Sequence, residues 1–265
     1  MIQQQSALTP QEILHGLSTR VLGQKIDCLS VTDSTNTEVK RLAESGAPDG
    51  TTVTAERQTG GKGRLGRVWD SPPTGGLYFT VLLRGKHLPE PLTNITLLAG
   101  LAVCTALREL FCVDARIKWP NDIVVDSKKI CGILAEAGFE NGRISWAAVG
   151  IGINVNNTAF PEELAYRATS LLLETGKPQS RCTVLQQVLE KFEPLLEAGI
   201  LRQAYTDLCI SLDKQVSFTQ NRQTFMGQAR GITPDGELLV VLPDNSTVAV
   251  GSGEVVVQGI YGEKV

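Results

Sequence analysis

The stretch GGKGRLGRVW, from Gly60 to Trp69, places three cations among four glycines within ten residues. Glycine has no Cβ, so the main chain can approach a partner closely, and ordering it costs conformational entropy. We therefore expect this loop to be mobile without a ligand and to be ordered by an anion.

The residues directly after the glycines decide which fold surrounds this loop. Gly61, Gly63 and Gly66 satisfy the pattern GxGxxG, but a dinucleotide-binding fold needs a helix directly after it and an acidic residue about twenty positions on. Here the sequence WDSPP leads into a strand, and the expected acidic zone reads Arg84-Gly85-Lys86. HRD and DFG tripeptides are absent, and no Gly-Lys pair precedes Ser or Thr, which excludes kinases and P-loop proteins. A solvated flexible loop is the alternative for this segment by itself.

The composition is that of a globular protein without a strong charge bias. The chain has 265 residues, is 42% hydrophobic and carries a net charge of −3, which argues against bulk nucleic-acid binding. Its six cysteines form no CxxC or Cys/His cluster, so we expect reduced, mostly buried thiols in a cytoplasmic protein. No secretory signal is visible, and the longest apolar run, LLAGLAVCTAL, is too short to span a bilayer.

Hydrophobic periodicity divides the chain near Leu212. Before it, strands and helices alternate, with strands expected at 26–32 and 77–83 and a long buried helix at 92–111. After it, short strands are separated by turn signals such as Asp235-Gly236. This pattern of short strands and turns predicts a small β-barrel as a second domain.

The segment KWPNDIVVDSKKICGIL, residues 118–134, contains polar residues where a strand would not favour them. Asn121 and Asp122 open an expected strand, although both residue types are depleted in strands. Lys129 begins the returning strand; it is either a charge that protects a sheet edge or an anion-binding group inside a site. Farther on, GIGINVN (150–156) predicts close backbone approach to a ligand, with Asn154 facing it.

Five blocks resemble the biotin protein ligase family in order and spacing. They are DSTN at 33–36, ERQTGGKGRLGRVW at 56–69, KWPND at 118–122, KKICGIL at 128–134 and GIGIN at 150–154. The resemblance runs from about Ile26 to the C-terminus, and five blocks in register are far more specific than any single one.

The resemblance implies an α+β fold in two domains. Residues 1–212 would form a mixed-sheet catalytic domain, similar to class II aminoacyl-tRNA synthetases and lipoate ligases, and residues 213–265 an SH3-like β-barrel. The implied reaction joins biotin to ATP with Mg²⁺, forms biotinyl-5′-AMP and pyrophosphate, and transfers biotin to a lysine of a biotin carboxyl carrier protein. Such chemistry needs clustered cations rather than a nucleophile, and with only His15 and His87 in the chain a triad hydrolase is not expected.

Position within the motifs implies a role for each site residue. The biotin contacts would be Ser34, Thr35, Asn36, Gln58, Lys62, Gly63, Arg64 and Lys129. The ATP or adenylate contacts would be Arg67, Trp69, Asn121 and Asn154. The catalytic residues would be Lys129, Arg64 and Asp122, with Asp122 orienting the incoming lysine amine. No metal ligand is assigned.

Two features depart from many relatives. Lys62 stands where they carry arginine and lacks the planar guanidinium, so we expect Lys62→Arg to slow adenylate dissociation. The first catalytic strand is expected at Ile26, which leaves room for one helix before it and not for a winged helix-turn-helix. A repressor role on DNA is therefore not expected.

Two other functions share part of this pattern. A lipoate or octanoyl transferase resembles this fold but generally lacks the glycine loop and KWPND, and a non-catalytic biotin-responsive regulator would bind biotin without releasing pyrophosphate. No membrane partner is expected, and a homodimer is one assembly that the resemblance allows.

Overall fold

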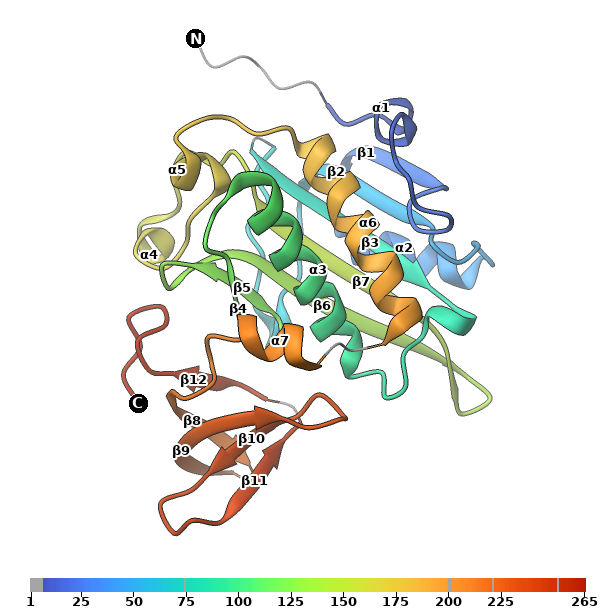
Figure 1. Ribbon diagram of the computed structural model, residues 1–265. Coiled ribbons are helices and arrows are strands. Elements are labelled where there is room, and N and C mark those ends of the chain that lie inside the picture. Colours follow the sequence, from blue (N-terminus) through green and yellow to red (C-terminus); the bar gives the residue numbers. More distant parts are fainter. Residues whose placement is uncertain (1–6, 74, 200–201, 221, 252) are drawn as a thin grey trace.

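The computed structural model describes residues 7–73, 75–199, 202–220, 222–251 and 253–265 (Figure 1). Its larger sheet has seven strands in the order β1-β2-β3-β7-β6-β5-β4. The strands are β1 (Ile26–Thr32), β2 (Thr52–Gln58), β3 (Gly76–Leu83), β4 (Arg116–Lys118), β5 (Asp122–Val125), β6 (Lys128–Glu140) and β7 (Arg143–Asn154). Strands β1 and β2 pair in parallel and the other neighbours pair antiparallel, so the sheet is mixed, as expected.

Helices cover both faces of this sheet. They are α1 (Pro10–Leu14), α2 (Thr35–Glu44), α3 (Asn94–Phe111), α4 (Glu162–Ala165), α5 (Leu171–Thr175), α6 (Arg181–Ala198) and α7 (Arg202–Leu208), with 3₁₀ turns η1 (Arg64–Gly66) and η2 (Gly85–His87). In Figure 1, α3 and α6 lie side by side in front of the sheet, whereas α2 packs on β2, β3 and β7. Strand β3 is buried along its whole length because its two faces meet two separate hydrophobic clusters.

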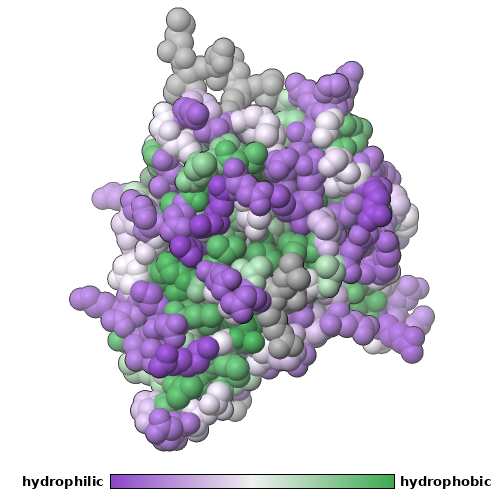
Figure 2. Space-filling view, in the orientation of Figure 1, coloured by the Kyte–Doolittle hydropathy of each residue, from purple (hydrophilic) through white to green (hydrophobic). Residues whose placement is uncertain are grey.

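Helix α3 is the central core element, and it is longer than the apolar run LLAGLAVCTAL that it contains. By length and composition it could cross a membrane, since it extends beyond the apolar run at both ends and reaches 18 residues. Two thirds of it is buried between the sheet and its neighbours, as in the core helix of a globular protein. On the side of the molecule that Figure 2 shows, hydrophobic residues gather over the middle and lower part of the molecule, with polar residues around them.

The second sheet is small and antiparallel. Its strands are β8 (Gln215–Gln220), β9 (Gln223–Ile232), β10 (Leu238–Val241), β11 (Thr247–Val250) and β12 (Val255–Val257), in the order β11-β10-β9-β8-β12. The α+β fold with a separate β-rich C-terminal part is therefore confirmed, and the boundary at 212/213 stays a prediction. Buried residues of this sheet such as Phe218 and Leu238 belong to the same hydrophobic cluster as α3.

Two local features place the site residues. Asp126 and Ser127 both have positive φ and form a two-residue hairpin loop between β5 and β6. The Trp119 indole N–H donates to the Gly236 carbonyl oxygen over 2.9 Å. The KWPND segment is thus fixed between the two sheets.

The cysteine expectation holds in part. All six cysteines are free, but only Cys104, Cys131 and Cys209 are buried, and Cys112 is exposed. Cys112 follows α3 at its C-cap position, where it adopts left-handed backbone, and its side chain is exposed.

Candidate functional site

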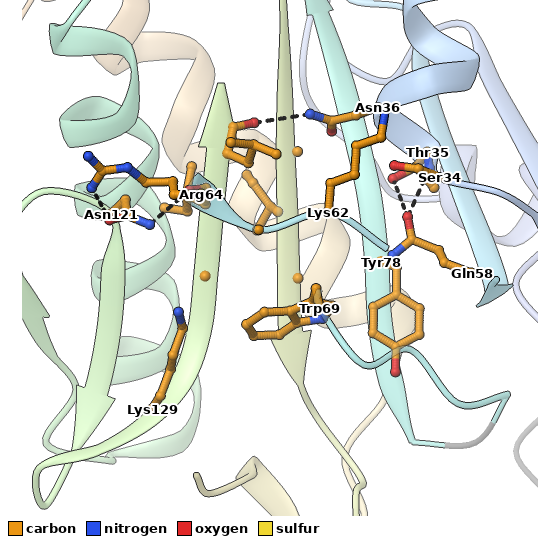
Figure 3. Close-up of a pocket in the computed structure, with 17 residues that line it drawn as sticks. Ser34, Thr35, Asn36, Gln58, Lys62, Arg64, Trp69, Tyr78, Asn121 and Lys129 are labelled. Carbon is orange, nitrogen blue, oxygen red and sulfur yellow. Dashed lines mark hydrogen bonds between the residues drawn. The ribbon is translucent and has the colours of Figure 1, made fainter. Parts of the chain in front are cut away.

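The glycine loop forms a narrow hairpin against β6 and β7 (Figure 3). Lys62 and Val68 form an antiparallel bridge, and the Gly63 N–H donates to the Arg67 carbonyl oxygen over 2.7 Å. At Gly61 a Cβ would lie only 2.3 Å from the Trp69 carbonyl oxygen, so a side chain cannot be accommodated there. This close approach explains part of the glycine content of the loop.

A small cavity of about 50 Å³ lies between this loop, the N-terminus of α2 and the end of β2. All eight residues expected to contact biotin line it: Ser34, Thr35, Asn36, Gln58, Lys62, Gly63, Arg64 and Lys129. The Thr35 N–H and hydroxyl both donate to Gln58 Oε1, over 2.8 and 3.1 Å. Ser34 occupies the N-cap position of α2, but its side chain makes no capping hydrogen bond, which leaves the hydroxyl available to a ligand.

Three glycines on β6 and β7 line the floor of this cavity. A Cβ at Gly150 would lie 2.0 Å from Asn36 Oδ1, and one at Gly152 or Gly132 would lie under 3.0 Å from the Trp69 ring. Gly132 and Gly152 are direct partners in the β6–β7 pairing. The indole can therefore lie flat on the sheet only because side chains are missing beneath it.

A larger cavity of about 530 Å³ continues on the other side of Trp69. The four residues expected to contact the nucleotide line it: Arg67, Trp69, Asn121 and Asn154. Five residues border both cavities: Gly63, Arg64, Trp69, Asn121 and Lys129. The two cavities therefore meet at two cationic side chains, Arg64 and Lys129.

Lys129 and Asp122 form an ion pair at this junction. Lys129 Nζ lies 2.6 Å from Asp122 Oδ1 and 5.3 Å from the centre of the Trp69 ring. Asp122 also accepts hydrogen bonds from Asn121 Nδ2 at 3.2 Å and from the Tyr261 hydroxyl at 2.8 Å. Burial opposes ionisation of Asp122, but the charges of Lys129 and Lys118 and the hydrogen bonds from Lys129 and Tyr261 outweigh it and hold the pKa of Asp122 below its usual value.

The three cations of the loop point to different places. Arg64 donates to Asn121 Oδ1 over 2.8 Å (Figure 3) and also to the Gly253 carbonyl oxygen over 3.0 Å. Arg67 forms an ion pair with Glu254 of the second sheet. Lys62 is exposed and donates to Thr37 Oγ1 over 2.9 Å, at the N-terminus of α2. The loop therefore connects α2, β5 and the second sheet.

One end of the Asn154 side chain is fixed by a hydrogen bond to the backbone. It is buried, and its Nδ2 donates to the Thr169 carbonyl oxygen over 3.0 Å, so its Oδ1 is the atom that remains for a ligand. The Trp69 indole N–H is buried without a hydrogen-bond partner among the described residues. Both groups border the larger cavity.

Several residues at the site had no role assigned from the sequence. Lys118, the first residue of KWPND, is buried beside the larger cavity, and burial lowers its pKa although Asp122 opposes the shift. Others are Tyr78, Gly132, Gly150, Phe160, Arg167, Glu254, Tyr261 and Glu263. The GIGIN and KKICGIL blocks already carried a signal for the glycines. No local pattern marked Glu254, Tyr261 or Glu263, which come from the second sheet and the segment after it.

Comparisons with known proteins agree with this geometry. Residues 28–154 match the Biotin/lipoate A/B protein ligase family, and residues 211–257 match the biotin protein ligase C terminal domain. The chain is 34% identical over 248 residues to the bifunctional ligase/repressor BirA of Bacillus subtilis, which covers 91% of this chain and 76% of the relative. The chain belongs to the biotin protein ligase family.

Other relatives extend the match to both parts of the chain. The biotin--[acetyl-CoA-carboxylase] ligase of Mycobacterium tuberculosis is 31% identical, over 88% of this chain and 89% of that protein. The biotin protein ligase from Aquifex aeolicus, solved in complex with biotin and ATP, superposes with a TM-score of 0.77 at 34% identity. That match covers 89% of this chain and 99% of the solved chain.

Proposed function

We propose that this chain attaches biotin to one lysine of a biotin carboxyl carrier protein, using ATP and passing through biotinyl-5′-AMP. The observation that carries the proposal is the junction of two cavities at Lys129 and Arg64. Biotin in the smaller cavity would direct its carboxylate to this junction, and ATP in the larger cavity would present its α-phosphate there. Two anions can meet at this point because two cations offset their repulsion.

The first step forms the mixed anhydride. A carboxylate oxygen of biotin attacks the α-phosphorus, the bond to the β-phosphate breaks, and pyrophosphate leaves with the electron pair. Lys129 would shift from Asp122 to the carboxylate and then to the acyl phosphate, while Arg64 and the backbone N–H groups of the loop bind phosphate oxygens. The smaller cavity has a volume of only about 50 Å³, so Trp69 and Lys62 would move apart as biotin enters.

Mg²⁺ would be held in the larger cavity by carboxylate side chains that line it, together with the substrate phosphates. The described residues contain no group of three or more His, Cys, Asp or Glu side chains that could hold a metal ion. Asp122 and Glu254 are paired with Lys129 and Arg67, whereas Glu263 Oε2 is buried without a hydrogen-bond partner among those residues. Mg²⁺ is commonly bound by one or two carboxylates together with substrate phosphates, and there it would neutralise phosphate charge.

In the second step the neutral carrier amine attacks the acyl carbon, the bond to the phosphate oxygen breaks, AMP leaves with the electron pair, and the amine proton passes to solvent. We assign Asp122 to orient this amine, because its carboxylate lies at the junction and is kept ionised. Asp122→Ala should slow transfer from preformed adenylate about tenfold or more while pyrophosphate release changes less than about threefold, a loss comparable to one charged hydrogen bond. A variant that loses pyrophosphate release but keeps normal transfer would remove Asp122 from this role.

The acceptor is proposed from relatives whose names specify acetyl-CoA carboxylase, so its carrier domain is the first substrate to test. The experiment measures pyrophosphate release with MgATP and biotin, lipoate or octanoate, followed by intact mass of an added carrier domain. We expect release with biotin alone and a mass gain of one biotinyl group. Release with lipoate or octanoate instead would favour the acyltransferase alternative, and biotin binding without release would favour a regulator.

A further inference from the structure

The segment after β12 returns to the large sheet and reaches the reaction site. It passes through tight turns, with positive φ at Gly259, Tyr261 and Gly262. The Tyr261 N–H donates to the Ser127 carbonyl oxygen over 3.1 Å, in the hairpin loop between β5 and β6. A tyrosine at φ 58° is uncommon and costs energy, so surrounding contacts must hold it there.

Those contacts converge on the tyrosine side chain. Its hydroxyl donates to Asp122 Oδ2 over 2.8 Å, and Lys118 Nζ lies 5.0 Å from the centre of its ring. Lys118 in turn donates to the Val255 carbonyl oxygen in β12 over 3.3 Å. The ring is thus held between a cation and a carboxylate that both belong to the KWPND segment.

The hydroxyl determines which oxygen of Asp122 is free for chemistry. Oδ2 is taken by Tyr261, so Oδ1 faces Lys129 at the junction of the cavities. Burial and the charge of Asp122 both raise the pKa of Tyr261, so the hydroxyl stays protonated and remains a donor. Without it, Oδ2 would lose its partner and the carboxylate could rotate away from the reacting amine.

We propose that Tyr261 is a positioning residue that holds the Asp122 carboxylate for amine transfer, so that the segment after β12 completes the active site of the large sheet. The inference rests on the proposed function and extends it to a residue outside the five sequence blocks. When Lys129 moves to the acyl phosphate, Oδ1 keeps its hydrogen bond from Asn121 and can accept a second one from the incoming amine. Tyr261 keeps that oxygen in place during the exchange.

The test is a double-mutant cycle of Tyr261→Phe and Asp122→Ala, read as the single-turnover rate of transfer from preformed biotinyl-5′-AMP to saturating carrier domain. Tyr261→Phe keeps the ring on Lys118 and removes only the hydroxyl. We expect it to slow transfer about tenfold, the loss of one hydrogen bond to a charged group. In the Asp122→Ala background the same change should cost less than about twofold, because the partner is already gone.

Tyr166→Phe is the matched control, since Tyr166 is exposed and does not border either cavity. It should leave the transfer rate unchanged. Transfer by Tyr261→Phe within twofold of the unmodified chain, or an equal loss in both backgrounds, would overturn the inference. Failure of the unmodified chain to biotinylate any carrier would instead refute the proposed function, so the two failures are distinguishable.

Discussion

Lys129 occupies the point where the two cavities meet. Its ammonium pairs with Asp122 at 2.6 Å and lies above the Trp69 ring, so it is held in place before any ligand arrives. A carboxylate or phosphate that enters either cavity places a second anion near Lys129, in addition to Asp122. On binding we therefore expect the Lys129 ammonium to change its ion-pair partner from Asp122 to the ligand.

Removal of this ammonium should affect adenylate formation most. We expect Lys129→Ala to lower the rate of pyrophosphate release about a hundredfold or more, the usual loss when one group that stabilises developing charge is deleted. Lys128→Ala is the control, because Lys128 is the neighbouring exposed cation and borders neither cavity. Stopped-flow detection of pyrophosphate, with circular dichroism to verify folding, makes the comparison; equal losses in the two variants would contradict the assignment.

Most of these residues were assigned because they lie in the blocks that resemble the family. Some also carry a physical signal, such as Asp122, a residue type depleted in strands, at the start of β5. Tyr261 carries no such signal. Its hydroxyl meets Asp122 across 139 positions of sequence, and only the docking of the second sheet creates that contact.

Strands β6 and β7 provide the floor of the site. Gly150 and Gly152 lie two positions apart on β7 and so face the same side of the sheet. Gly150 faces Asn36 and Gly152 faces Trp69, which places the α2 end and the loop end of the site on one strand. The glycine pattern thus fixes how closely α2 and the loop approach the sheet.

A methyl group on this floor should displace the polar end of α2. In Gly150→Ala the new Cβ would lie 2.0 Å from Asn36 Oδ1, so we expect biotin affinity to fall at least about tenfold. Gly231→Ala in β9 is the control, since its Cβ would meet only Leu239 at 3.6 Å, an ordinary contact. Isothermal titration calorimetry with biotin measures both variants, and unchanged affinity in Gly150→Ala would refute the role of the floor.

The elements themselves were largely predictable, and their exceptions have causes. β1 runs over Ile26–Thr32 as its alternation predicts, and α3 lies within the expected 92–111. Helix α1 is a single short turn that ends at Leu14, because the chain turns at Gly16 with φ 106°. Thr9 caps this helix and Pro10 is its first residue, both local signals, whereas its length depends on packing.

At the scale of the whole molecule, the N-terminal segment is attached to the core through Glu193 of α6. This buried carboxylate accepts hydrogen bonds from the backbone N–H groups of Arg20, Val21 and Leu22, at 2.7, 2.9 and 2.8 Å. Burial opposes its ionisation, but these hydrogen bonds outweigh that effect and lower the pKa of Glu193 below the ordinary value of 4.5. Its contribution to stability is therefore present above pH 4.5 and is lost as the pH falls through the lowered pKa.

Glu193→Gln should lower the free energy of unfolding at pH 7 by roughly 1–3 kcal/mol, since the amide accepts fewer and weaker hydrogen bonds from these groups. The difference from the unmodified chain should stay constant above about pH 5 and shrink below about pH 4.5, where Glu193 of the unfolded chain begins to take up its proton. Urea unfolding at pH 7 and pH 3.5 measures this difference in the free energy of unfolding. Glu44→Gln, an exposed position, is the control, and a difference that grows at low pH would contradict the account.

The two sheets act as one structure around the site. Arg64 reaches Gly253, Arg67 pairs with Glu254, and Tyr261 binds Asp122, so the loop and the KWPND segment are both connected to the second sheet. Patterns in the sequence predicted a second domain but not this connection, because none of these contacts is local. The site is therefore a property of both parts of the chain.

The central claim is that biotin and the nucleotide meet between Lys129 and Arg64, and the most direct measurement is a crystal structure of the chain with biotinyl-5′-AMP. We expect the biotin rings against Ser34, Thr35 and Asn36, the adenosine on the far side of Trp69, and the acyl phosphate within hydrogen-bonding distance of both cations. An acyl phosphate bound away from Lys129 and Arg64, or biotin outside the smaller cavity, would contradict the account.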